Sequence, residues 1–339
     1  MIYRFVCILL FMLMPSTLLL AKPKQVFTQI QALTPPKKLL GVSDTLNIAI
    51  IVNIYGIYGD TRVDSINEQS FPPDSLLAVN AGLSLKNRLE DSPFFIDYDF
   101  PVYKYKRDRT DSVMLEVDEL RQLAEGIQAD YIITVDIIGI NFLYEVNNIE
   151  YRGEKLTYTS AKVPYRFLFG YYDTRLNKIK DIQLVNDTLI FDTGLYRVDA
   201  GTMYVLDGLP SIDEATLKAT ELSVQTYADM IVPHWVEEER YFYNDGSRDM
   251  KKAVKHVENQ EWYEAMEIWM EITSYADLKQ AALACFNMAL ACEMMDDFNL
   301  AIEWLNLARK KDPKLSVNEY EQVLYRRLND KTVIDRVLK

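Results

Sequence analysis

The sequence of 339 residues has little of what catalytic and cofactor sites usually require, because it contains only 2 histidines, 3 cysteines and 12 glycines. His234 and His256 belong to no HExxH motif or paired-ligand spacing, so no histidine-based metal or catalytic site is expected. The sequence has no GxxxxGKS, GxxxxGKT or GxGxxG loop to hold a phosphate, and no G-x-S-x-G motif to present a nucleophilic serine. These absences favour a non-enzymatic protein without a metal or cofactor.

Cysteine is too scarce to form a disulfide framework. Beyond Cys7 the sequence contains only Cys285 and Cys292, which are seven residues apart in a helical pattern. That separation is about 10 Å along a helix axis, whereas a disulfide requires Cα atoms within about 7 Å. We therefore expect both to be small core residues.

Positive charge is also in short supply. The chain has 37 lysines and arginines against 50 aspartates and glutamates, and a formal net charge of −13. Binding to nucleic acid needs basic side chains that neutralise phosphates. The sequence contains no long basic block that would reverse this balance locally, so no nucleic-acid partner is expected.

The N-terminus is typical of an exported protein. Residues 1–21 begin with one basic residue, Arg4, continue as a short apolar run and end on the small residue Ala21. This is the pattern of a secretory signal peptide. Cys7 lies too early to carry a lipid anchor, so we expect a chain that starts near Lys22 in the periplasm or outer envelope, with no membrane span after cleavage. An uncleaved anchor remains an alternative.

Strand-like segments dominate the first two thirds of the chain. They are short runs of β-branched and aromatic residues, and the apolar residues from Val163 to Tyr171 alternate as in a strand with one buried face. Pro164 predicts that its strand begins there or lies at a sheet edge. Residues 175–178 suit a hairpin connection, and the expected strands are 46–56, 94–105, 131–138, 163–171 and 180–193.

Three helices accompany these strands: two lie between strands and the third follows the last strand. Their apolar residues recur at helical spacing, and the third starts with a capping box, Ser211 to Glu214, and ends at Pro233. The order of elements predicts an α+β domain over residues 22–240, a mixed sheet with helices on one face. The expected core positions of the first two helices are Leu77, Ala81, Leu85, Leu89, Val117, Leu120, Ala124 and Ile127.

Residues 246–331 show only helical patterns and contain an internal repeat. Segments that begin at Gln260 and Asp296 align at an offset of 36 residues. Self-similarity at this period predicts stacked helical hairpins. The matched pairs are Trp262 with Phe298, Ala265 with Ala301, and Trp269 with Leu305.

The second repeat resembles the tetratricopeptide repeat family. It has small residues at the family's positions, Ala289, Ala301 and Ala308, and a closing Pro313, although Cys285 and Cys292 replace the usual tryptophan and tyrosine. The resemblance implies an all-α array with a terminal capping helix near residues 316–330. It also implies a concave groove that binds a protein or peptide, lined by Leu283, Phe286, Leu290, Glu293 and Met294.

The first domain has a likeness of its own. A helix leads through Gly126, Ala129, Asp130 and Tyr131 into an inner strand. This arrangement resembles the periplasmic α+β domains of bacterial envelope proteins such as the curli secretion lipoprotein, and it implies a fold more than a function. As a whole the chain resembles exported bacterial envelope proteins that join such a domain to C-terminal repeats.

These patterns together predict a non-enzymatic envelope protein that acts as a scaffold. We expect its groove to bind another envelope protein or peptide, and a charge placed at Leu290 to abolish binding without unfolding the chain. One alternative is an envelope glycan-binding module or weak glycan hydrolase that uses tyrosines and carboxylates of the first domain, among them Asp97, Asp99, Asp130 and Asp136. A second alternative is a structural subunit whose repeats only pack against its own first domain. The sequence leaves the oligomeric state open.

Overall fold

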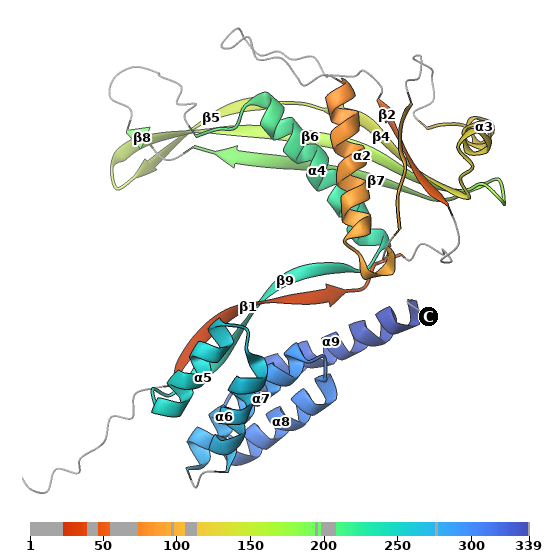
Figure 1. Ribbon diagram of the computed structural model, residues 1–339. Coiled ribbons are helices and arrows are strands. Elements are labelled where there is room, and N and C mark those ends of the chain that lie inside the picture. Colours follow the sequence, from red (N-terminus) through yellow and green to blue (C-terminus); the bar gives the residue numbers. More distant parts are fainter. Residues whose placement is uncertain are drawn as a thin grey trace, which may run out of the picture. The chain divides into compact units, whose positions relative to one another are not determined.

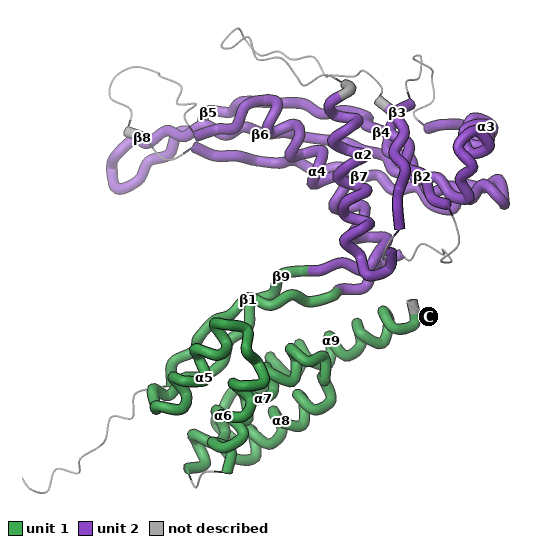
Figure 2. The backbone as a smooth tube through the Cα atoms, in the orientation of Figure 1, with its two compact units in different colours: residues 1–33, 236–336 green, residues 34–235, 337–339 purple. Residues whose placement is uncertain are grey.

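The computed structural model describes residues 23–38, 47–54, 74–95, 98–105, 114–193, 196–197, 208–274 and 277–337. The chain forms two compact units, which are shown in separate colours in Figure 2. Unit 1 combines residues 1–33 with 236–336, and unit 2 combines residues 34–235 with 337–339. The expected signal peptide, residues 1–21, lies outside the described residues. None of the described helices has the length and apolar character needed to cross a membrane.

Unit 2 is built on a mixed sheet, as expected. Strand β2 pairs in parallel with β3 and β4, whereas β6 pairs antiparallel with β4, β5, β7 and β8 (Figure 1). The order along the main path is β3-β2-β4-β6-β5. The strands are β2 (Ile48–Ile54), β3 (Val102–Tyr105), β4 (Tyr131–Ile140), β5 (Leu143–Tyr151), β6 (Glu154–Asp173), β7 (Lys178–Asp192) and β8 (Tyr196–Arg197).

The position of Pro164 differs from the expectation. Its strand, β6, neither starts there nor lies at an edge, because β4 and β5 pair with its two halves on one side and β7 pairs on the other. The carbonyl oxygen of Pro164 accepts the N–H of Asn141 at 2.9 Å, between the end of β4 and the start of β5. The position where proline lacks an N–H therefore faces the bend between β4 and β5. The pairing of β6 with these strands loses only one hydrogen bond there.

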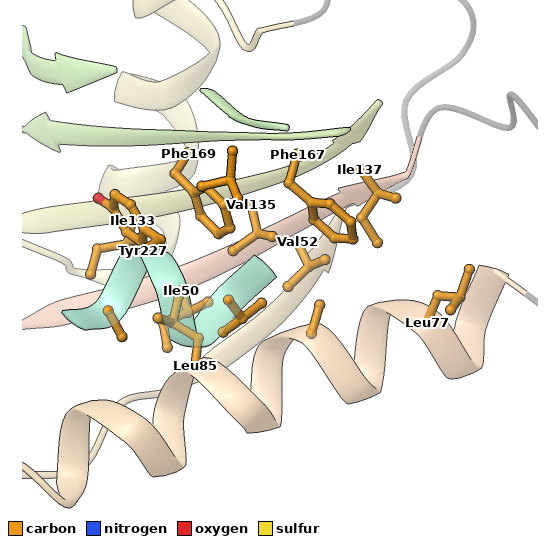
Figure 3. Close-up of a cluster of buried hydrophobic side chains, with 14 of the residues drawn as sticks. Ile50, Val52, Leu77, Leu85, Ile133, Val135, Ile137, Phe167, Phe169 and Tyr227 are labelled. Carbon is orange, nitrogen blue, oxygen red and sulfur yellow. The ribbon is translucent and has the colours of Figure 1, made fainter. Parts of the chain in front are cut away.

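Helices cover both faces of the sheet rather than one. Helices α2 (Asp74–Glu90) and α4 (Ile212–Ile231) share a core with Ile48, Ile50 and Val52 of β2, and Figure 3 shows this core in close-up. Helix α3 (Val117–Ile127) packs on the opposite face, against Ala49 and Ile51. Successive side chains of a strand point to opposite faces, and β2 is apolar at every position from Ile48 to Val52, so it can carry helices on both sides.

The helical patterns of unit 2 are otherwise confirmed. Leu77, Ala81, Leu85 and Leu89 are buried on α2, and Leu120 and Ala124 are buried on α3. The Ser211 capping box is present at the start of α4. The Ser211 hydroxyl accepts the N–H of Glu214, which satisfies a donor that the first helical turn would otherwise leave free. A short 3-10 turn, η1 (Pro93–Phe95), follows α2.

Among its described residues, unit 1 joins five helices to a two-stranded sheet formed by β1 (Lys24–Thr34) and β9 (His234–Asn244). The helical C-terminal region is as expected, but the α+β domain expected over residues 22–240 includes all of β1 and most of β9. Glutamines alternate with apolar residues in β1, and charged residues crowd β9, so neither strand has a strong apolar signal. The helices are α5 (Arg248–Glu258), α6 (Trp262–Thr273), α7 (Leu278–Met294), α8 (Phe298–Lys311) and α9 (Asn318–Val337).

The two cysteines are free and buried on α7, as expected. Burial raises the pKa of the Cys285 thiol to about 11 and that of the Cys292 thiol to about 12. Both are therefore neutral core residues near neutral pH.

Gly82 is required where α2 approaches β3. A Cβ at this position would lie 2.4 Å from Cγ1 of Val102 and 3.3 Å from Cγ2 of Val52. At an exposed helix position, Gly→Ala would raise the free energy of unfolding by about 1 kcal/mol. Here the overlap of the new Cβ with Val102 and Val52 costs about 1–3 kcal/mol. We expect Gly82→Ala to lower the free energy of unfolding by on the order of 1 kcal/mol, measured by urea unfolding followed by circular dichroism.

The matched control is Asn87→Ala, at an exposed position of the same helix. It gains helix propensity without a clash, so it should leave stability unchanged or slightly higher. If both variants were equally stable, the close approach of α2 to β3 would be contradicted.

Candidate functional site

The five residues expected to line the groove all lie on α7, and the structure places four of them in the interior of unit 1. Leu283, Phe286, Leu290 and Glu293 are at most 7% exposed, and Met294 is half-buried. The structure therefore brings the expected residues together on one helix, but it does not leave them open to a partner. Their contacts show what fills the groove.

Aromatic side chains of β9 and α9 surround Phe286. Its ring stacks on Tyr241 at a centroid distance of 5.3 Å and an interplanar angle of 19°. Tyr243 meets the same ring edge-on at 4.9 Å, and Tyr320 packs against it at 5.2 Å. Such pairs add about 0.5–1.5 kcal/mol each beyond the apolar area they bury. Strand β9 thus occupies the centre of the expected groove.

Asn287 holds the backbone of β9 in place. Its Oδ1 accepts the N–H of Tyr243 at 2.7 Å, and its Nδ2 donates to the carbonyl oxygen of Tyr243 at 2.8 Å. Asn287 is fully buried and Tyr243 is nearly so. One amide that satisfies both polar groups of a residue binds an extended backbone whatever its side chain is.

A buried ionic cluster fixes the neighbouring turn of α7. Arg240 of β9 donates to Glu293 through Nε at 3.1 Å and through Nη2 at 2.9 Å. Arg327 of α9 donates to the same carboxylate at 2.9 Å, and the hydroxyl of Tyr320 donates at 2.6 Å. A second carboxylate, Glu238, accepts from Arg240 at 2.5 Å. The carboxylates therefore compensate the guanidinium groups inside the unit.

The pKa values in this cluster follow from burial and charge. Burial, together with the Glu293 charge and hydrogen bond, raises the pKa of Tyr320 well above its usual value, so the phenol remains a donor. Burial by itself would raise the pKa of Glu238. The hydrogen bond from Arg240 and the positive charges of Arg240 and Arg326 outweigh the effect of burial, so the pKa of Glu238 is lowered. Glu238 therefore stays ionised and compensates Arg240 down to acidic pH.

The groove of unit 1 is thus filled by the chain's own strand. Leu290 is fully buried, so the expectation that a charge there would leave the chain folded is wrong: a buried unpaired charge is strongly destabilising. Tyr241 and Tyr243 alternate with Phe242 just after Arg240. That segment was the signal for a groove-filling strand which the sequence analysis missed.

The carboxylates named for a glycan site have structural partners. Within the described residues, no group of three or more His, Cys, Asp or Glu side chains has the arrangement of a metal site. Asp97 lies outside the described residues. The others are held within unit 2: Asp99 by Lys86, Asp130 by the backbone N–H of Asn47 at 2.9 Å, and Asp136 by Nδ2 of Asn53 at 2.8 Å.

The tyrosines of β6 between Tyr165 and Tyr172 do not form an exposed platform for a sugar. Tyr165, Tyr171 and Tyr172 are at most 5% exposed. Tyr165 and Tyr171 point into the core below α2 and α4, and Tyr172 into the core below α3.

Large apolar side chains are instead exposed on the face of the unit 2 sheet that α2 and α4 do not cover. They pair across the sheet with even-numbered residues of β6, whereas the odd-numbered residues Val163 to Tyr171 enter the core with α4. Each is between 38% and 56% exposed. We call this set the open sheet face: Leu143, Ile149 and Tyr151 of β5, and Ile182, Leu184 and Ile190 of β7.

Comparison with protein families gives two matches. Residues 46–243, more than half of the chain, match the family described as "Domain of unknown function (DUF8603)". The chain belongs to this family. Residues 251–328 match a second description, "Domain of unknown function (DUF6340)". The first match covers most of unit 2 and continues through β9, and the second covers most of the helices of unit 1.

Distant likenesses to solved structures accompany these matches. A homolog of the neuraminyllactose-binding hemagglutinin from Helicobacter pylori is 9% identical with a TM-score of 0.28, over 57% of this chain and 84% of that chain. The PelC dodecamer from Paraburkholderia phytofirmans is 10% identical with a TM-score of 0.23, over 61% and 99%. At these scores neither structure bears on function here. No curated protein matches the chain.

Removing the side chain of Asn287 tests whether its two hydrogen bonds to Tyr243 stabilise β9. In Asn287→Ala the buried N–H and C=O of Tyr243 lose their partners, and each unsatisfied group costs about 1–3 kcal/mol. We expect a loss of about 2–4 kcal/mol in the free energy of unfolding of unit 1. Tryptophan fluorescence in urea measures it, since Trp262, Trp269 and Trp304 lie in this unit. Asn299→Ala, exposed on α8, is the control and should match the unsubstituted chain.

Neutralising Glu293 tests the ionic cluster. Glu293→Gln keeps the size of the side chain but leaves Arg240 and Arg327 without their shared carboxylate, and breaking a buried pair in this way costs about 3–5 kcal/mol. The same fluorescence measurement should show this loss. The control is Glu303→Gln at an exposed position of α8. Equal stability of the two variants would contradict the buried cluster.

Proposed function

We propose that this chain is a non-enzymatic exported envelope protein that acts as a scaffold through protein–protein contact. Its partner binds the open sheet face of unit 2 rather than the groove of unit 1. The observation that carries this proposal is the set of six large apolar side chains, each 38% to 56% exposed, on one face of the sheet. Export rests on the signal-peptide pattern of residues 1–21.

The distribution of these side chains supports a binding role. Single exposed apolar residues are common on soluble proteins and need no explanation. Several large exposed apolar residues on one face are instead characteristic of interaction sites. Ile182 and Leu184 are neighbours on the open sheet face, Asn186 and Thr188 separate them from Ile190, and the residues of β5 extend the same face along β6.

The helical repeats have a different role in this proposal. They resemble peptide-binding repeats, and they do hold an extended strand, but that strand is β9 of the same chain. Asn287 and Glu293 together satisfy the backbone of Tyr243 and the side chain of Arg240. The repeats therefore fix the β1–β9 sheet within unit 1 and leave recognition of a partner to unit 2.

Substitution on the open sheet face tests the proposal. Leu184→Glu places a carboxylate among the apolar side chains that a partner would cover, and burying it costs more than the 1.4 kcal/mol that corresponds to a tenfold loss of affinity. We expect at least a tenfold loss of partner captured after crosslinking in intact envelopes. The substitution is on an exposed side chain, so circular dichroism should be unchanged.

Leu83→Glu is the matched control, because Leu83 is 48% exposed on α2, on the other face of the same sheet. It should retain the partner. Loss with Leu83→Glu and retention with Leu184→Glu would place the contact on α2 and contradict the proposal, as would capture that neither variant alters.

A further inference from the structure

Strand β7 presents a long unpaired edge beside the open sheet face. It runs from Lys178 to Asp192 and pairs with β6 on one side (Figure 1). Within the described part of the chain, no other strand pairs with its outer side. A long edge with apolar side chains is a template for another strand.

The ladder with β6 shows which backbone groups of β7 point outward. The carbonyl oxygen of Pro164 faces β4 and β5, so Pro164 and its partner Thr188 exchange no hydrogen bonds. The N–H of Thr193 donates to the carbonyl oxygen of Thr159 at 2.9 Å, so the odd-numbered residues face β6. Because these directions alternate along a strand, the even-numbered residues from 182 to 192 turn their N–H and C=O groups to the free edge.

The same even-numbered residues carry the exposed apolar side chains. Ile182, Leu184 and Ile190 therefore offer both backbone bonds at the edge and apolar contact on the open sheet face. A second strand added here would satisfy the edge and cover part of that face in one step. The occupant must be extended and apolar on one side, which describes β7 itself.

We propose that two copies of this chain pair antiparallel through β7, with Asn186 opposite Asn186 of the second copy, so that two sheets become one. The proposal rests on the interaction role proposed for the open sheet face, and it names a second copy as the partner. Between Ile182 and Ile190 this pairing gives about ten backbone hydrogen bonds. The interface is isologous, as in most two-fold dimers.

The side chains select this register over its neighbours. With Asn186 at the two-fold axis, Ile182 lies opposite Ile190, so two apolar side chains meet, and Leu184 lies opposite the β-branched Thr188. A shift of the axis to Asp187 would place two aspartates opposite each other, which is unfavourable. A shift to Val185 would place Ile182 opposite Thr188 and Leu184 opposite Asn186, so the two isoleucines would no longer meet.

A bulge sets the length of the edge that is available for this register. Lys180 sits in the bulge where the ladder with β6 shifts, and this bulge limits the regular edge to residues 181–192. The edge is therefore long enough for one self-pairing of defined length.

One local contact competes with the pairing. Oδ1 of Asp187 accepts the N–H of Thr188 at 2.7 Å. This bond satisfies an outward donor in the single chain, and a carbonyl oxygen of the second copy would replace it. The exchange substitutes one hydrogen bond for another, so its net cost is small.

Disulfide trapping of the purified full chain tests the register. Paired residues that exchange hydrogen bonds have Cα atoms about 5.5 Å apart, within the range of a disulfide. Asn186→Cys should therefore form a crosslinked dimer under mild oxidation. Thr188→Cys is the control, since its two copies would lie four residues out of register, about 13 Å apart. We expect crosslinking at least tenfold faster for Asn186→Cys.

Two further measurements complete the test. A mixture of Leu184→Cys and Thr188→Cys should crosslink preferentially between the two variants, because these residues are opposite each other. Sedimentation equilibrium of the unsubstituted chain should show a dimer that Leu184→Glu converts to a monomer. The unsubstituted chain measures the background of oxidation, because it retains Cys7 and the buried Cys285 and Cys292.

The outcomes separate this inference from the proposed function. A monomer at all concentrations, with Asn186→Cys no faster than Thr188→Cys, overturns the β7 dimer. If Leu184→Glu still loses its partner in envelopes, the proposed function survives and the partner is a different protein. A dimer whose crosslinks do not follow the register through Asn186 overturns the pairing while leaving self-association.

Discussion

The alternation of side chains along β6 governs the architecture of unit 2. Its odd-numbered residues from Val163 to Tyr171 enter the core with α4, where Phe169 stacks on Tyr227 at 4.3 Å. The register then sends the even-numbered side chains of β7 to the opposite, open face. The same period turns their backbone groups to the free edge. One strand thus determines what is buried, what is exposed and what remains available for pairing.

Unit 1 depends on a different constraint, the need to satisfy polar groups buried on α7. Asn287 and Glu293 are both buried, and neither finds its partner on its own helix. Strand β9 supplies the backbone of Tyr243 and the guanidinium of Arg240. Because an unsatisfied buried amide or carboxylate is costly, the helices and the strand are stable only together, which explains why a segment before α5 belongs to the helical unit.

Local patterns in the sequence predicted the elements whose signal is local. The strand that begins at Tyr131, the alternation from Val163 to Tyr171 and the Ser211 capping box all depend on neighbours in sequence, and all are present. Strand β9 has no such local signal, because its partners on α7 lie about 50 residues away. The tight turn between β5 and β6 was not expected either, because Arg152 adopts a positive φ of 54°. The residues expected to line a groove on α7 are mostly buried, because contacts with β9 and α9 depend on the tertiary fold.

The energetic difference between the two candidate surfaces explains why the open sheet face is the better one. A partner entering the groove would have to displace β9, separate Arg240 from Glu293 and uncover the aromatic rings around Phe286. Each of these losses subtracts from affinity, and the ion pair alone accounts for about 3–5 kcal/mol. A partner on the sheet face displaces only water from side chains that are already exposed. For an interface of similar size and composition, this difference favours the sheet face as the proposed partner site, while the contacts of β9 with α7 keep unit 1 intact.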